Sequence, residues 1–104
     1  MEKTFINHGQ NEVKENSYWM INDGDIIITI GDIKYDAYDK EIEVITVQVN
    51  SSLGPIIESR DNYGNGMKSG QLIKVKTVER IIVCTIIEIN PDSVTILLTE
   101  NKLN

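Results

Sequence analysis

The alternation of apolar and polar residues is clearest in the last third of the chain. Between Gln71 and Glu100, β-branched side chains crowd two extended runs, which the residues Asn-Pro-Asp-Ser at 90–93 separate. Proline presets φ for the second position of a type I turn, and Asn and Ser suit the ends of such a turn. β-branched residues fit a pleated strand better than a helix. The pattern therefore predicts a β-hairpin, which further strands must cover because an isolated hairpin is marginal in water.

A second hairpin is predicted nearer the N-terminus. Residues 18–21 (Tyr-Trp-Met-Ile) and 25–30 flank Asn-Asp-Gly at 22–24, residue types that tolerate the positive φ of a tight turn. Gly31 and Asp32 then interrupt the apolar run, as a bulge or as another turn. We expect two antiparallel strands here.

In two further stretches, the apolar positions shift from one face of the predicted strand to the other. In residues 41–49, the apolar positions change face between Val44 and Ile45, and a similar break falls near residues 78–80. Such a break indicates a bulge, a strand that crosses between sheets or, at 78–80, a tight turn between separate strands 72–78 and 81–89. Repeated breaks in short strands are typical of a small, strongly curved barrel or sandwich.

Two segments have no decisive pattern. Residues 1–17 are polar apart from Phe5, Ile6 and Val13, and fit an N-terminal arm, a short first strand or a short irregular element. Residues 50–70 include a candidate short edge strand at 56–58 and a Gly/Asn-rich stretch at 59–70. Structureless connections of this length are uncommon in compact domains unless they are functional or mobile. We expect one β domain over residues 18–104.

The composition supports the same fold class. The 104 residues suffice for one domain, and they include 18 Ile, 8 Val and 7 Thr against 5 Leu and a single Ala. AT-rich codons also favour Ile, but codon usage does not produce alternation. The prediction is an all-β fold, a small antiparallel barrel or sandwich of six to seven short strands in the size range of SH3-like and OB-like folds.

The charge balance narrows the choice of partners. The formal net charge is −6 at pH 7 and the pI is about 4.6. This argues against direct nucleic-acid binding and against attraction to an anionic membrane, since both need clustered Lys and Arg. Neither a signal-peptide pattern nor an apolar run of about 20 residues is visible, so the expected location is cytoplasmic.

The sequence offers little reactive chemistry. It has one cysteine, Cys84, and one histidine, His8, which excludes an intramolecular disulfide and a His/Cys zinc site. Cys84 lies in an apolar run that should raise the pKa of its thiol. Five aspartates match no EF-hand spacing and suit turns and solvated surface: Asp23, Asp25, Asp32, Asp36 and Asp39. We predict a protein that is not an enzyme and needs no metal or cofactor.

Two groups of residues are candidate binding sites. In the Gly-rich loop, backbone amides and two cations could surround an anionic ligand, or the loop could contact a protein, or merely connect strands. On the strand at 18–20, alternation places Trp19 in the core and leaves Tyr18 and Met20 on a possible exposed face. The loop candidates are Arg60, Tyr63, Gly64, Gly66, Met67 and Lys68.

Three functional hypotheses remain open from the sequence. The leading one is a non-catalytic binding module that acts through protein–protein contacts, by an exposed sheet edge or the 50–70 loop, or that assembles as a homo-oligomer. An alternative is a protein that binds a small anionic ligand, a nucleotide or metabolite, with the 59–70 loop. A third is a small acidic phage or mobile-element inhibitor of a host protein.

Overall fold

Antiparallel strands make up every regular element of the described chain. The computed structural model describes residues 3–38, 40–51, 57–60 and 66–103, and no helix occurs in these ranges. The all-β prediction is confirmed. The described ranges contain ten strands where six to seven were expected, because the N-terminal segment is a full strand and residues 26–51 form four strands. They are β1 (Lys3–Lys14), β2 (Tyr18–Ile21), β3 (Ile26–Ile30), β4 (Ile33–Asp36), β5 (Glu41–Val44), β6 (Val47–Ser51), β7 (Ile57–Arg60), β8 (Leu72–Lys76), β9 (Arg80–Ile89) and β10 (Ser93–Leu103).

The larger layer is a five-stranded sheet with the order β1-β10-β9-β8-β7. Its centre is the predicted β9–β10 hairpin, whose turn is closed by a 2.8 Å hydrogen bond from the Asn90 N–H to the Ser93 carbonyl. At the next turn, the Thr77 N–H donates to the Arg80 carbonyl at 2.8 Å. Residues 72–76 and 80–89 are therefore separate strands joined by a tight turn, one of the alternatives left open above.

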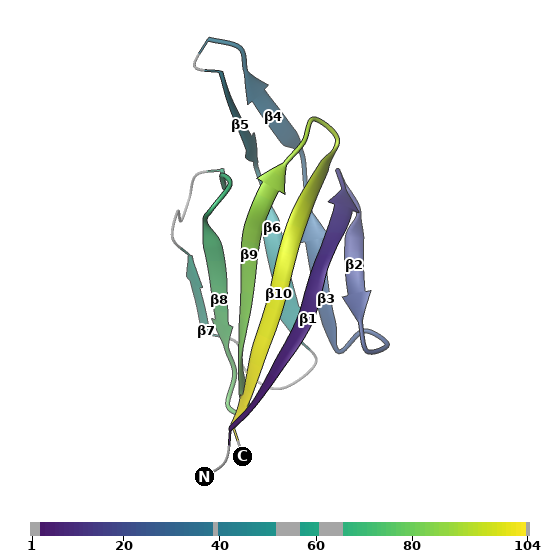
Figure 1. The fold of residues 1–104 in the computed structure, drawn as a ribbon, viewed down its shortest axis with the longest axis vertical. Coiled ribbons are helices and arrows are strands. Elements are labelled where there is room, and N and C mark those ends of the chain that lie inside the picture. Colours follow the sequence, from purple (N-terminus) through teal and green to yellow (C-terminus); the bar gives the residue numbers. More distant parts are fainter. Residues whose placement is uncertain (1–2, 39, 52–56, 61–65, 104) are drawn as a thin grey trace.

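The N-terminal segment forms the edge of this sheet. Strand β1 pairs with β10 along its whole length, from Lys3 opposite Leu103 to Lys14 opposite Ser93, with a register shift between Asn7 and Gly9. Gly9 has φ of +80°, which glycine adopts without strain. Twelve residues in one strand are more than the arm or short strand considered from the sequence. Figure 1 shows the start of β1 beside the end of β10.

The second layer lies behind the first in Figure 1 and has the order β2-β3-β6. The β3–β6 register continues into β4–β5, since Ile30 pairs with Val47 and Ile33 with Val44. The interruption falls at Gly31 and the residues opposite it, where a Cβ on Gly31 would lie 3.0 Å from Thr46 Cβ. Val44 and Val47 are both buried although they are three residues apart, which is the phase change seen in the sequence. Ile45 lies at the break in strand pairing and is 44% exposed. The change of face between Val44 and Ile45 had predicted that Ile45 shares the face of Val47, which is buried.

The core fills the space between these layers. Trp19 packs against it, as alternation predicts, and Met67 and Cys84 belong to it. Its buried members are Val13, Ile21, Ile26, Ile28, Ile30, Val44, Val47, Val49, Met67, Ile73, Val75, Ile82, Cys84, Ile86, Ile89, Val94, Ile96 and Leu98.

Candidate interaction surface

The β4–β5 hairpin projects beyond the two packed layers, at the top of Figure 1. Its strands pair from Ile33 opposite Val44 to Asp36 opposite Glu41 and form a sheet of their own. At the tip, the Tyr38 N–H donates to Asp36 Oδ1 at 2.9 Å. An aspartate that bonds the backbone two residues on stabilises a tight turn.

An apolar face runs from the core out along this hairpin. Because side chains alternate along a strand, the Tyr35–Ile42 pair lies on the same face as the Ile33–Val44 pair. Val44 is 0% exposed, and Ile33 and Ile42 are partly buried against the core, whereas Tyr35 is 60% exposed. Tyr38 at the tip is 94% exposed. The apolar face of the hairpin is therefore a continuation of the core-facing surface of its layer. It extends beyond the point where the opposing five-stranded sheet ends.

The hairpin is held both at its base and near its tip. The backbones of Val44 and Met67 exchange hydrogen bonds of 2.8 and 2.9 Å, and Lys68 Nζ lies 2.6 Å from Glu41 Oε2. On the other strand, the Ile33 N–H donates to Glu15 Oε2 at 2.7 Å. These contacts orient the hairpin before any partner arrives.

The described residues of the predicted binding loop lie against the core or beside acidic side chains. Met67 is 3% exposed: its backbone pairs with Val44 and its side chain joins the core, so this placement does not favour the predicted contact with a ligand or partner. The charge of Lys68 already faces Glu41. A Cβ on Gly66 would lie 2.6 Å from the Glu43 carboxylate, so a negative charge occupies the space beside this glycine. Tyr63, Gly64 and the side chain of Arg60 lie outside the described residues.

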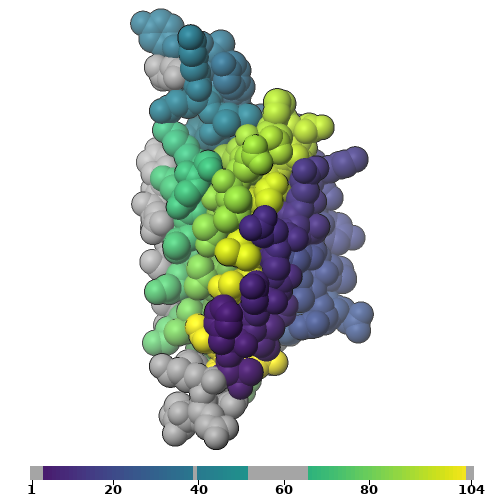
Figure 2. Space-filling view, in the orientation of Figure 1, coloured from purple at the N-terminus to yellow at the C-terminus, as the bar shows by residue number. Residues whose placement is uncertain are grey.

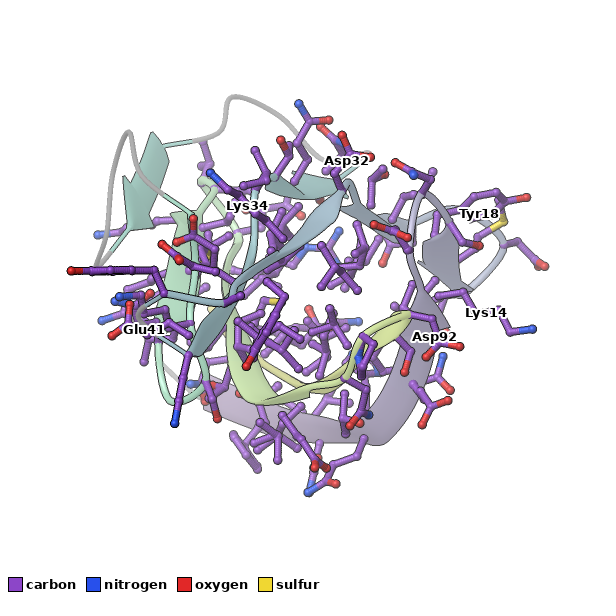
Figure 3. The ribbon with its side chains drawn as sticks, turned by 90° about the horizontal axis from the view of Figure 1, so that it is seen from above. Lys14, Tyr18, Asp32, Lys34, Glu41 and Asp92 are labelled. Carbon is purple, nitrogen blue, oxygen red and sulfur yellow. The ribbon has the colours of Figure 1, made fainter. Side chains whose placement is uncertain are left out.

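Tyr18 and Met20 are on the outward face of the second layer. They are 60% and 49% exposed, in the orientation expected from alternation, and Met20 pairs with Ile27. Figure 3 shows Tyr18 and Glu41 on opposite sides of the molecule. The Tyr18–Met20 face is therefore separate from the hairpin.

Sequence reasoning missed a buried ionic network between the layers. Arg80, at the start of β9, binds both oxygens of Asp25 at 2.6 and 2.7 Å and also contacts Glu100 at 3.2 Å and Ser51 Oγ. Glu100 Oε1 in turn lies 2.8 Å from His8 Nε2. Asp25 was expected to be solvated surface charge, and instead its carboxylate is the main partner of a buried arginine.

The network pairs opposite charges in a place that water hardly reaches. The side chains of Arg80 and Glu100 are 1% and 0% exposed. The hydrogen bond with Asp25 raises the pKa of Arg80, burial opposes this rise, and the charges of Asp25 and Glu100 add to it. Within the described part of the chain, Arg80 Nε has no hydrogen-bond partner. The network ties β1, β9 and β10 of one layer to residues beside β3 and β6 of the other.

A signal for this network was present in the sequence. Arg80 is in phase with the buried positions Ile82, Cys84 and Ile86, and Glu100 is in phase with Ile96 and Leu98. Alternation alone directs both charges toward the core.

The remaining reactive side chain is also enclosed. Cys84 is buried in β9, and this burial raises the pKa of its thiol to about 12. Among residues 3–38, 40–51, 57–60 and 66–103, no group of three or more His, Cys, Asp or Glu side chains could hold a metal ion. The described residues thus offer exposed tyrosines more readily than a reactive centre.

Comparison with known proteins assigns no family. The chain matches no protein-family model, no curated protein and no solved structure. In the part of the chain that the structure describes, no helix has the length and apolarity needed to cross a membrane.

Proposed function

We propose that this protein is a non-catalytic binding module that contacts a protein partner through the β4–β5 hairpin. The observation that carries the proposal is the apolar face that leaves the core and ends at two exposed tyrosines, Tyr35 and Tyr38. Tyrosines are enriched among the residues that contribute most to protein interfaces.

The arrangement favours binding energetically. A tyrosine offers a large contact area while losing little conformational freedom, and the anchored base of the hairpin reduces the ordering that a partner must impose. A partner surface laid on Tyr35 would extend the core beyond Ile42. A small acidic inhibitor of a host protein, the third hypothesis from the sequence, is a special case of such a module.

The anionic-ligand alternative has less support. Of its two cations, Lys68 already contacts Glu41 at 2.6 Å. The Glu43 carboxylate beside Gly66 would repel an anion held by the loop amides. These placements make protein binding the better-supported proposal.

The test compares the hairpin tyrosines with a tyrosine on another face. Tyr35 and Tyr18 are both 60% exposed, so Tyr18→Ala is the matched control for Tyr35→Ala, and the double variant Tyr35→Ala, Tyr38→Ala adds Tyr38, which is 94% exposed. Each immobilised protein is incubated with extract of its native cells, captured proteins are quantified by mass spectrometry, and the affinity of a captured partner is then measured. We expect the double variant to bind more than about tenfold more weakly and the control to bind like the wild type.

The opposite pattern would reject the hairpin as the contact surface. If the double variant retains every captured protein while Tyr18→Ala loses one, the partner lies on β2. Circular dichroism of all variants confirms that each loss reflects contact and not unfolding.

A further inference from the structure

The outward face of the five-stranded sheet carries an apolar surface without a covering layer. Strand β9 buries Ile82, Cys84 and Ile86 toward the core, yet its alternate positions Ile81 and Val83 are also β-branched and apolar. A strand that is apolar on both faces is typical of a sheet covered on both sides. In Figures 1 and 2, strands β8, β9, β10 and β1 form the near face, and no other described segment lies over them.

The strand registers place the residues of this face in four rows. The apolar members are Phe5, Leu72, Ile81, Val83 and Leu97, and Phe5 is 62% exposed. Across β8, β9, β10 and β1, the rows run Lys76–Ile81–Asn101–Phe5, Lys74–Val83–Thr99–Asn7 and Leu72–Thr85–Leu97–Gln10, and a fourth row of three runs Glu88–Thr95–Glu12.

Within these four rows, the charges are segregated. Lys74 and Lys76 lie on β8 at one corner, and Glu12 and Glu88 lie in the row at the opposite end of the face. All four side chains are exposed. None of the four forms an ion pair or side-chain hydrogen bond with another described residue. Within the four rows, the face is therefore basic at one corner, apolar in the middle and acidic at the far end, and the exposed Lys14, two residues beyond Glu12 on β1, lies past the acidic row.

We infer that the occupant of this face is a second copy of the same chain. A surface with opposite charges at opposite ends is complementary to itself, as a two-fold dimer requires. In this dimer, the two-fold axis lies in the plane of the face and is perpendicular to the line from Lys76 to Glu12. The rotation brings Lys76 toward Glu12 of the second copy and Lys74 toward Glu88 of the second copy. The apolar rows then meet, with the strands of the two copies crossing near the orthogonal angle of about 90°.

The face is small for a specific interface. Four strands and four rows span about 500 Å² per copy, since strands lie about 4.8 Å apart and rise about 3.4 Å per residue. The total of about 1,000 Å² is at the low end for specific interfaces, in the range of weak and transient contacts, so the association must be measured up to high protein concentration.

The primary experiment measures mass in solution. Sedimentation equilibrium between about 1 μM and 500 μM should show conversion of the monomer to a dimer. Lys74→Glu with Lys76→Glu, and separately Glu12→Lys with Glu88→Lys, should each weaken the dimer by at least about tenfold because like charges then meet. The variant with all four changes should recover affinity to within about threefold of the wild type.

Three outcomes overturn the inference. They are a wild-type chain that stays monomeric over the whole range, a dimer that neither charge variant weakens, and a fourfold variant that remains as weak as the parent variants. A monomer that captures a different protein through this face, with capture lost in the charge variants, likewise assigns the face to that protein. Circular dichroism and urea unfolding keep loss of fold distinct from loss of association.

Cross-linking provides an independent readout. Within one copy, Lys76 and Glu12 are separated by three strands and several residues, on the order of 25 Å, which a zero-length carbodiimide linker cannot span. A Lys76–Glu12 cross-linked peptide found in the dimer band supports the proposed pairing. Its absence from an efficiently cross-linked dimer contradicts that pairing. The hairpin variants Tyr35→Ala and Tyr38→Ala should leave dimerisation unchanged, which separates this inference from the proposed function.

Discussion

The two ends of the molecule distribute charged and aromatic side chains in opposite ways. At one end, Arg80 and Glu100 are 1% and 0% exposed and lie between the layers. At the other, Tyr35 and Tyr38 are 60% and 94% exposed on a hairpin that projects past the core. Charged residues are almost never buried unless they are paired, and aromatic residues usually supply buried area.

The difference shows what each end contributes. In the buried network, every charge has a partner of opposite sign, so removing one member leaves another charge in an apolar environment. On the hairpin, each tyrosine has little contact with its own chain, so its removal costs the fold little. The first end is therefore expected to determine stability, and the second to determine binding. The following predictions test this division.

The largest effect is expected from Arg80→Met. The substitution leaves Glu100 buried without its counter-charge and should destabilise the protein by about 3–5 kcal/mol. Urea unfolding followed by circular dichroism measures the change. Lys102→Met, which removes an exposed cation opposite Arg80 in the register, should change stability by less than about 0.5 kcal/mol. Equal effects of the two substitutions would contradict the role assigned to the network.

A smaller loss is expected from Glu100→Gln. The amide keeps the shape of the side chain but loses the charge-assisted bonds to Arg80 and His8, so the expected cost is about 1–3 kcal/mol. Glu79→Gln, an exposed position in the turn before β9, is the matched control and should be near neutral. The same urea experiment decides between these expectations.

The buried thiol should make stability fall at alkaline pH. Burial raises the pKa of Cys84 from 9.0 to about 12, so the unfolded chain loses this proton at lower pH than the native chain. The contribution is fully present below pH 9 and is lost as pH rises toward about 12; at about pH 10 the loss is about 1 kcal/mol. The difference in pH dependence between the wild type and Cys84→Val isolates this contribution. Parallel profiles would show that the thiol ionises equally in both states.

The smallest effect on stability is expected at the hairpin. Tyr35→Ala with Tyr38→Ala should change the free energy of unfolding by less than about 0.5 kcal/mol, because both side chains are mainly solvated. The same variant is the one expected to lose its partner. A loss of several kcal/mol in urea unfolding would mean that the tyrosines support the fold, and the division between the two ends would fail.

The sequence supported the hairpins well and the projecting region poorly. Turn residues at 22–24 and 90–93 and the alternation beside them are local signals, so β2–β3 and β9–β10 were predictable. The sequence pattern that puts Ile33 and Tyr35 on one face is the same whether or not another layer covers that face. Exposure of Tyr35 depends on where the opposing layer ends, and residues distant in sequence set that limit.

Three other placements depended on distant partners. Polar β1 is a strand because β10 pairs with it, and Met67 is buried because its backbone pairs with Val44. Arg80 and Glu100 were in phase with core positions, yet a charged residue gives no local sign that its counter-charge lies on another strand. The positions could be predicted from alternation, but the pairing could not.

The pairing of the first strand with the last has a consequence for biosynthesis. Because Lys3 lies opposite Leu103, β1 has no partner until the residues of β10 have left the ribosome. The sheet therefore closes only after translation of the whole segment, and contacts so distant in sequence slow the search for the native state. Until then, β1 remains an unpaired strand in the nascent chain.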